Sequence, residues 1–543
     1  MAALVVVLPL ILRGCSCGHD FDFHLVSWFE AAAQFRSGTL HPAWAFSPAW
    51  NAGEPRFVFY PPLSWTLGGL LGMVLPWGAV PVVYTWIALT AAGAGMYKLA
   101  REFAGEHAAA IAAAVYVANP YMVFTAYERT AYAELLAAAW IPLLLAGVLR
   151  ERVTVLRVAL PVGLLWLTNA PAAVMGCYAV AVLGVVRLVM TWWRPTHRDS
   201  AAMSGTQSVI GGVGLGLGLA AFYVLPAAYE RRWVQIGMAM VSGMRIEDNF
   251  LFHHTADALH DEVLHTASVI AVAMLAAAAI VLGVAIVRAR KMRRVAISLA
   301  VLAAVIGVML IPLSAGVWRV APEMGFLQFP WRLVAVLAAV TCTGLAIAME
   351  GVKLKGAVIV VGALGLVAAM SLPTATVFRQ ACDEEDNIAA RWAVFDAKSG
   401  TDATDEYTTG EADNDALAHD DPAYWLAEDG EGKASGGGAQ SGPVPMHFVV
   451  NAEKSEVLVL NLRAYPAWRV KVNGVEKGVR VERADGLIAV PVAAGMLKVD
   501  ISYERGWDQK VGGGISVAAL AGALGVAMYG RRRRVPASRI IEN

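Results

Sequence analysis

The dominant pattern along the chain is a succession of apolar runs separated by short polar segments. A bilayer core of about 30 Å needs roughly 20 helical residues to cross it, so these runs predict membrane-spanning helices. We expect apolar helices at 2–12, 62–76, 79–98, 107–127, 131–149, 153–168, 170–192, 208–228, 267–287, 295–313, 331–349, 354–373 and 512–529. The predicted fold class is therefore a mainly α-helical, polytopic membrane protein with about 12–13 hydrophobic helices.

Composition supports this interpretation. Of 543 residues, 58% are hydrophobic and 16% are charged, and the mean hydropathy is +0.55. These values exclude a soluble enzyme and a nucleic-acid-binding protein, and they make the lipid bilayer the first expected partner. The 43 Lys and Arg residues balance the 43 Asp and Glu residues, so only the distribution of charge is informative.

Basic residues are concentrated in alternate short loops, which predicts that these loops face the cytoplasm. The basic positions are Lys98, Arg101, Arg150, Arg152, Arg157, Arg194, Arg198, Arg288, Arg290, Lys291, Arg293, Arg294, Lys353, Lys355 and Arg531 to Arg534. The loops expected on the outer face are 14–61, 120–130, 229–266, 314–330 and the long segment 374–511.

Because 14–61 and 374–511 are both expected on the outer face, the chain between them must cross the membrane an even number of times. Eleven of the expected apolar runs lie between them, so one of these runs does not cross. We expect 62–76, which begins at Pro61-Pro62, to enter the bilayer only partway. The run 2–12 is short and makes a poor signal peptide, so we expect the true start of translation to lie upstream.

The outer segment divides by composition. Residues 383–431 contain 16 acidic residues against Arg391 and Lys398, which predicts a solvated, partly mobile region. From 446 to 503 apolar positions alternate and turn signals such as Asn473-Gly474 recur, which predicts a small antiparallel β-sandwich. The expected domains are a transmembrane domain 1–373, an acidic segment 374–440, a β-sandwich 441–510, and a final helix with a basic cytoplasmic tail 511–543.

The densest polar motif is Gly-His-Asp-Phe-Asp-Phe-His at 18–24, directly after the first apolar run. In a helix Asp20 and His24 would share a face, where they could act as a general base with its orienting partner or hold a divalent cation. Asp22 is the nearest competitor. The structural alternative is that one carboxylate only caps a helix at 25–35.

Further polar residues gather on the expected outer face, where side chains from separate helices could converge on one cavity. Aromatic and basic groups beside each other suit a lipid-linked phosphate or a sugar ring, and Glu134 lies in an apolar pattern that demands a basic partner, Arg129 or Arg332. The candidate substrate-binding residues are Arg56, Tyr60, Glu128, Arg129, Glu134, Glu230, Gln328 and Arg332.

The five cysteines form no even-numbered disulfide framework. Unpaired thiols are the favoured interpretation, and a bridge from Cys15 or Cys17 to Cys382 is the alternative. The spacing of Cys15, Cys17, His19 and His24 matches none of the usual structural zinc sites.

Taken in order, the motifs G-H-D-F-D-F-H, F-Y-P-P-L, Y-E-R-T-A-Y-A-E-L, F-Y-V-L-P-A-A-Y-E and F-L-Q-F-P-W-R-L resemble a bacterial multi-spanning membrane family labelled 6-pyruvoyl-tetrahydropterin synthase-related. Nothing in the chain looks like a soluble pterin enzyme, so the label is a misnomer. The order of motifs also resembles polytopic glycosyltransferases of the GT-C type, which take a sugar from a polyprenyl-phosphate carrier on the outer face. The resemblance covers nearly the whole chain, including Ala464 to Trp468.

This resemblance implies that an acidic residue of the first outer loop is the catalytic base or a cation site. By position the role falls on Asp20, with Asp22 as the alternative. Thr168-Asn169 departs from the pattern, because a histidine is expected there in relatives.

The expected function is an inverting glycosyltransferase of the bacterial inner membrane, with a polyprenyl-phosphate sugar as donor and a cell-envelope acceptor. Arg56, Arg129 or Arg332 would neutralise the departing lipid phosphate. Apart from the possible divalent cation, the sequence indicates no cofactor. The rival hypothesis is a non-enzymatic transporter or assembly factor for envelope lipids or polysaccharide, which discontinuous helices or inverted repeats would favour.

Overall fold

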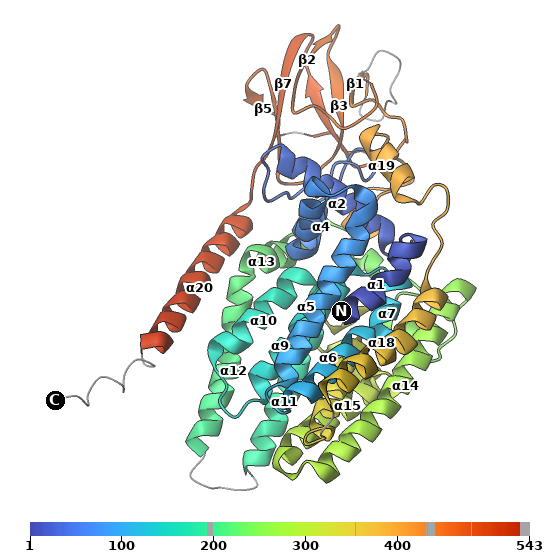
Figure 1. Ribbon diagram of the computed structural model, residues 1–543. Coiled ribbons are helices and arrows are strands. Elements are labelled where there is room, and N and C mark those ends of the chain that lie inside the picture. Colours follow the sequence, from blue (N-terminus) through green and yellow to red (C-terminus); the bar gives the residue numbers. More distant parts are fainter. Residues whose placement is uncertain (193–198, 353–354, 430–431, 433–439, 479, 533–543) are drawn as a thin grey trace, which may run out of the picture.

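The computed structural model describes residues 1–192, 199–352, 355–429, 432, 440–478 and 480–532. Most of these residues are helical, and the helices gather into one elongated bundle with the β-strands at one end (Figure 1). The C-terminal helix α20 runs from the strands along one side of the bundle and packs against α12 and α13. The protein is thus a mainly α-helical polytopic membrane protein with a C-terminal β region.

Nine helical segments among the described residues are long and apolar enough to cross a bilayer. They are Trp77–Ala100, Glu106–Tyr127, Tyr132–Leu149, Ala170–Met190, Ala258–Arg288, Arg290–Met309, Pro330–Ala348, Gly356–Phe378 and Trp507–Met528. Each coincides with an expected apolar run. Shorter apolar helices occupy the runs expected at 2–12, 62–76 and 153–168.

The helices of the bundle are α1 (Ala2–Arg13), α4 (Pro62–Val74), α5 (Val80–Ala100), α6 (Glu106–Ala118), α7 (Pro120–Tyr127), α8 (Tyr132–Ala137), α9 (Trp140–Leu149), α10 (Val155–Thr168), α11 (Ala170–Trp192), α12 (Asp199–Leu219), α13 (Ala221–Glu230), α14 (Ala258–Arg288), α15 (Arg293–Met309), α17 (Val334–Ala348), α18 (Gly356–Phe378) and α20 (Trp507–Arg532). The other α-helices are α2 (Phe21–Arg36), α3 (Arg56–Phe59), α16 (Ala315–Val320) and α19 (Ile388–Asp396). The 3-10 turns are η1 (Trp77–Ala79), η2 (Arg231–Trp233), η3 (Ile236–Met240), η4 (Ile246–Asn249), η5 (Arg290–Met292), η6 (Pro312–Ser314), η7 (Met324–Leu327), η8 (Pro330–Leu333) and η9 (Asp405–Tyr407).

The run expected at 208–228 is not one straight helix. The segments Gly205–Leu219 and Ala221–Trp233 meet at an angle of 75°. At this bend α20 comes very close, because a Cβ atom placed on Gly512 would lie 2.6 Å from the carbonyl oxygen of Ala221. The hydroxyl of Ser516 accepts a hydrogen bond from the backbone N–H of Phe222 (2.9 Å), which supplies a partner at the break.

Helix α17 forms the centre of the bundle and is buried almost all round. An apolar helix with no polar stripe has no face to turn to solvent, which is why it is surrounded by other helices. It packs against α5, α6, α14 and α15. Its N-terminal end is continuous with η8, which carries Arg332.

The β region contains two antiparallel sheets of order β1-β3-β6 and β2-β7-β4-β5. The strands are β1 (Tyr424–Ala427), β2 (His447–Ala452), β3 (Glu456–Arg463), β4 (Trp468–Val472), β5 (Val475–Glu476), β6 (Leu487–Val492) and β7 (Gly495–Tyr503). Asn473 and Gly474 both have positive φ, 51° and 80°, in the two-residue turn between β4 and β5. The hairpin expected at this pair is confirmed.

The acidic segment contributes more structure than its composition suggested. Strand β1 pairs with β3 from Tyr424↔Leu460 to Ala427↔Val457, so the sheet begins before residue 441, where the sequence placed its boundary. The same segment forms α19 and η9. Apolar residues at 423–427 were outweighed in the composition by the surrounding carboxylates, which explains the error. Residues 430–431 and 433–439 of the acidic segment lie outside the described residues.

Strand β3 is buried on both faces. Leu458, Leu460 and Leu462 lie in the apolar core with β4, β6 and β7. On its other face, Val457 and Val459 pack in a cluster with Ala49 and Ala52. The β region thus packs against the loop that follows α2.

One disulfide joins Cys17 to Cys382 across 365 residues, with their Cα atoms 5.0 Å apart. The favoured interpretation of unpaired thiols was therefore wrong for these two cysteines, because sequence separation hid the return of the chain after α18. The Cys15 Sγ lies 3.5 Å from the Cys382 Sγ.

We predict that 14–61 and the β region both face outwards, since disulfides persist in oxidising compartments. A cysteine introduced at the exposed Val449 should react with an impermeant maleimide in intact cells. A cysteine introduced at the exposed Arg290, between α14 and α15, should react only after permeabilisation. The reverse pattern would overturn the orientation.

We also predict that Cys382→Ser lowers the thermal midpoint of the purified protein more than Cys17→Ser does. A disulfide contributes typically about 2–4 kcal/mol to the free energy of unfolding. In Cys17→Ser the neighbouring Cys15 can replace the lost partner, whereas Cys382→Ser removes both possible bridges. Equal loss in both variants, measured by thermal denaturation with and without reductant, would contradict this prediction.

Candidate functional site

The motif at 18–24 is held against the turn that joins α7 to α8. The backbone N–H of Asp20 donates to the carbonyl oxygen of Arg129 (2.9 Å). A Cβ atom on Gly18 would lie 2.2 Å from the carbonyl oxygen of Glu128, so only glycine permits this approach. The position of Asp20 is consequently fixed by main-chain contacts between two distant segments.

The Asp20 carboxylate is accessible. Asp20 occupies the N-cap position of α2, yet its side chain makes no capping hydrogen bond. The side chain is 42% exposed, and Oδ2 lies 3.8 Å from Nη2 of Arg129. Capping therefore does not explain this carboxylate.

A buried ion cluster lies beside Asp20. Glu134 is 5% exposed, and its Oε2 lies 2.7 Å from Nη1 of Arg129 and 3.7 Å from Nε of Arg332. The hydroxyl of Tyr121 donates to its other oxygen. The expected pairing of Glu134 with Arg129 or Arg332 across separate elements is confirmed, and it involves both arginines.

The two arginines differ in how much of each guanidinium is occupied. Arg129 contacts Glu134 and Asp20 and lies over the ring of Trp331, 4.9 Å from its centroid. Arg332 lies over the ring of Phe329, also at 4.9 Å, and its Nη1 donates to the Leu327 carbonyl (3.1 Å). Within the described part of the chain, Nε of Arg332 is buried without a hydrogen bond. The described residues supply no hydrogen-bond partner for Nη2, so Arg332 retains donor capacity for a ligand at that atom.

Asp22 has a different environment from Asp20. Its Oδ1 lies 2.8 Å from Nε of Arg391 on α19, and that arginine also donates to Asp386 (2.7 Å). Asp22 therefore ties α2 to the acidic segment. The Arg391 guanidinium occupies the Asp22 carboxylate at 2.8 Å, whereas the cation nearest to Asp20 lies 3.8 Å away, so the Asp20 carboxylate is the more available of the two.

His24 does not form the expected side-chain pair with Asp20. Its ring is buried and lies edge-on to the rings of Tyr60 and Tyr132, with centroids 5.7 and 5.4 Å away. Burial lowers the pKa of the His24 imidazole to about 4, so the ring is neutral at physiological pH. The helical spacing was right, but the aromatic neighbours that enclose His24 come from other segments.

Tyr60 packs against two rings of the motif, Phe23 and His24. Its ring centroid is 4.8 Å from that of Phe23. Burial, with a further contribution from the Asp20 carboxylate, raises the pKa of Tyr60 well above its ordinary value. The hydroxyl therefore stays protonated and can donate a hydrogen bond.

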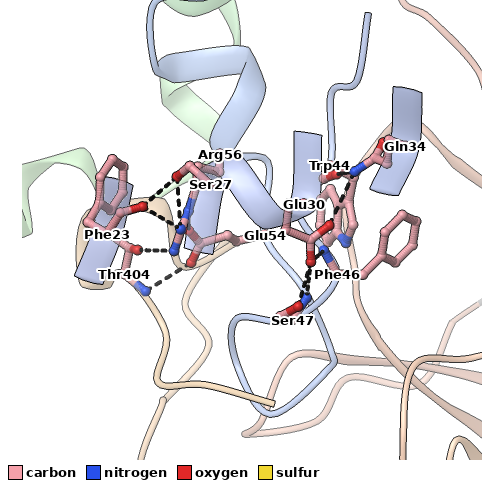
Figure 2. A network of polar contacts seen from close by, with 10 residues as sticks. All are labelled: Phe23, Ser27, Glu30, Gln34, Trp44, Phe46, Ser47, Glu54, Arg56 and Thr404. Atoms are coloured by element: carbon pink, nitrogen blue, oxygen red, sulfur yellow. Dashed lines mark hydrogen bonds and ion pairs between the residues drawn. The ribbon is translucent and has the colours of Figure 1, made fainter. Parts of the chain in front are cut away.

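The guanidinium of Arg56 is occupied by the protein (Figure 2). Its Nε lies 2.7 Å from Oε1 of Glu54, Nη1 donates to the Ser27 hydroxyl (3.1 Å), and Nη2 donates to the Thr404 hydroxyl (3.1 Å). The other oxygen of Glu54 accepts the backbone N–H of Thr404 (2.9 Å). Arg56 was expected to bind a ligand, but these contacts give it an architectural role.

Figure 2 also shows Glu30, which the sequence analysis did not single out. Its Oε1 accepts hydrogen bonds from the backbone N–H of Phe46 (2.9 Å) and from the backbone N–H and hydroxyl of Ser47 (2.6 and 2.7 Å). Its place among apolar residues of α2 was a signal that could have identified it. Together with Arg56, Glu30 makes the first outer loop a rigid wall.

Three other expected residues occupy peripheral positions. Glu128 accepts a hydrogen bond from Gln380 (2.7 Å). Glu230, at the end of α13, accepts hydrogen bonds from Tyr465 and Gln509 and so joins α13 to the connection between β3 and β4 and to α20. Gln328 donates to the Ala239 carbonyl (2.5 Å). These contacts hold loops together, and none of them is a contact with Asp20.

A metal site at Asp20 and His24 receives no support from the described residues. Among all the described residues, one group of three His, Cys, Asp or Glu side chains brings its ligand atoms close together, and it consists of Cys15, Cys17 and Cys382. Two of these sulfurs are joined in the disulfide and cannot ligate as thiolates.

No protein-family model matches the chain, and no curated protein matches it in sequence. The solved structures similar to it include two cryo-EM structures of the arabinofuranosyltransferase AftD from Mycobacteria, one of a mutant. Each is 17% identical to this chain with a TM-score of 0.42, and each match covers 74% of this chain. The chain spans 28% and 30% of the length of those two chains.

Proposed function

We propose that the protein is a membrane glycosyltransferase that moves a sugar from a polyprenyl-phosphate donor to a cell-envelope acceptor at the outer end of the bundle. The observation that carries the proposal is the position of Asp20. Its accessible carboxylate has no capping role, is fixed by the α7–α8 turn, and lies beside the Glu134, Arg129 and Arg332 cluster.

Asp20 is the general base in this mechanism. An acceptor hydroxyl oxygen attacks the anomeric carbon of the donor sugar while its proton passes to the Asp20 carboxylate. The bond from the anomeric carbon to the phosphate oxygen breaks, and the lipid phosphate leaves with the bonding electrons. Attack on the face opposite the leaving group inverts the anomeric configuration.

Arg332 neutralises the departing phosphate, because its guanidinium retains donor capacity and is held by Glu134. Arg129 holds Glu134 in place and lies 3.8 Å from the Asp20 carboxylate, so it links the cluster to the base. The protonated Tyr60 hydroxyl donates a hydrogen bond to the sugar. Arg56 is left out of the proposed contacts, since Glu54, Ser27 and Thr404 occupy it.

The alternative is a non-enzymatic transporter or assembly factor for envelope lipids or polysaccharide. The break of 75° between α12 and α13 favours it, because broken helices are common around transporter binding sites. In that case the outer end would bind ligand without chemistry. Incubation of purified protein with labelled polyprenyl-phosphate sugars separates the two hypotheses.

We predict that Asp20→Asn lowers turnover about 10²-fold or more while expression and thermal stability are retained. Asparagine preserves size and hydrogen bonding but cannot accept the proton. Asp22→Asn is the matched control, and it should lose far less activity. A dead Asp22→Asn with an active Asp20→Asn would transfer the role to Asp22, and full activity in both would exclude the motif from the reaction.

A further prediction distinguishes the two arginines. Arg332→Gln should lower turnover about 10²-fold with a modest effect on stability, since it removes the cation that donates hydrogen bonds to the departing phosphate. Arg129→Gln should also lower the free energy of unfolding by about 3–5 kcal/mol, because it removes the nearest cation from the buried Glu134.

The double variant Arg129→Gln with Glu134→Gln is the control for that second effect. It removes both partners of the pair and should recover most of the thermal stability but not the activity. If Arg332→Gln, Arg129→Gln and the double variant were equally destabilised, Arg129 and Arg332 would not have the different roles proposed for them.

A further inference from the structure

The end of the bundle opposite the strands contains a hollow of about 860 Å³. The turn between α9 and α10, the end of α11 and the start of α15 line it. Its charged lining is strongly basic and consists of Arg150, Arg152, Arg157, Arg187, Lys291 and Arg294 against Glu102 and Glu151.

Two of these cations are already occupied. Arg150 forms an ion pair with Glu102, and Arg187 donates to the carbonyl oxygens of Arg150 and Glu151, both at 2.7 Å. Among the described residues, Arg152, Arg157, Lys291 and Arg294 make no ion pair with a carboxylate. The hollow therefore has an excess of positive charge that an anion would neutralise.

An apolar groove of about 310 Å³ continues from this hollow. The two cavities share Glu102, Arg150 and Arg157 in their linings. Beyond these residues the groove runs between α9 and α10 along leucines, namely Leu143, Leu156, Leu160 and Leu164. Leu160 is 51% exposed, so the groove opens at the lateral surface of the apolar helix α10.

The general excess of cations on cytoplasmic loops explains why this end is basic, but it does not explain why cations from three segments surround one hollow. Arg288, Arg290 and Arg293 belong to the same basic loop as Lys291 and Arg294 and do not line the hollow. The lining is thus a subset of the basic residues, selected by geometry.

We propose that this hollow binds the phosphate headgroup of an anionic membrane lipid, with a hydrocarbon chain of the lipid in the adjoining groove. Basic pockets between membrane helices are suited to such headgroups. The apolar groove favours a lipid over free phosphate, because a hydrocarbon chain would cover the leucines of the groove and a free anion would not. This site lies at the other end of the bundle from Asp20 and does not depend on the proposed glycosyl transfer.

The test is native mass spectrometry of the full-length protein, titrated with dioleoyl-phosphatidylglycerol or with zwitterionic dioleoyl-phosphatidylcholine. Lys291→Gln with Arg294→Gln removes two lining cations, and Arg290→Gln with Arg293→Gln removes two neighbours that do not line the hollow. A cation near an anionic headgroup is worth about fivefold in affinity. We therefore expect the first pair to weaken binding of the anionic lipid roughly 30-fold and the control pair to weaken it no more than about threefold.

Equal weakening by both pairs would overturn the proposal in favour of diffuse loop charge, as would equal binding of the two lipids. Displacement of the bound lipid by millimolar inorganic phosphate would show that the hollow takes a free anion and would equally overturn it. If the first variant fails to assemble, Arg152→Gln with Arg157→Gln applies the same test from the opposite wall.

Discussion

A carboxylate surrounded by apolar helices must be neutralised where it lies, and Glu134 imposes this requirement on the helical bundle. Two arginines meet it from separate elements, one from the turn before α8 and one from η8 before α17. Burying Glu134 without an arginine, or one of the arginines without Glu134, would cost free energy of folding. The cluster therefore fixes the relative positions of α8 and α17, and the first outer loop is attached to the same turn through its backbone.

The other charged side chains around the proposed base, Asp20, have partners of their own within the protein, which leaves the Asp20 carboxylate accessible. Arg391 pairs with Asp22, Glu54 pairs with Arg56, and Glu30 binds the loop that follows α2. The β region then covers the far side of this loop through the buried second face of β3. A wall of this kind can hold a carboxylate in position, which general-base chemistry requires.

The parts of the structure that follow from local pattern could be predicted from the sequence. The apolar runs gave the helices, the turn at Asn473-Gly474 gave a hairpin, and the burial of Glu134 in an apolar pattern demanded a cation. Contacts between distant segments could not be predicted. The ion-pair partner of Arg56, Glu54, is only two residues away and was overlooked, while its second partner Thr404 is 348 residues away. Strand β1 was hidden among the carboxylates that surround it in the sequence. His24 had the right spacing for a catalytic pair, but its environment is set by Tyr60 and Tyr132 from other segments.

The bond between Cys17 and Cys382 closes a covalent ring that contains every helix from α2 to α18. During synthesis, Cys17 emerges long before Cys382, which follows the last helix of the ring. The ring can close only when α18 has been inserted and the segment after it has returned to the side of the membrane that holds Cys17. Closure is therefore a chemical record that the chain between the two cysteines has crossed the membrane an even number of times, because one crossing too few or too many would keep the two sulfurs on opposite sides of the bilayer.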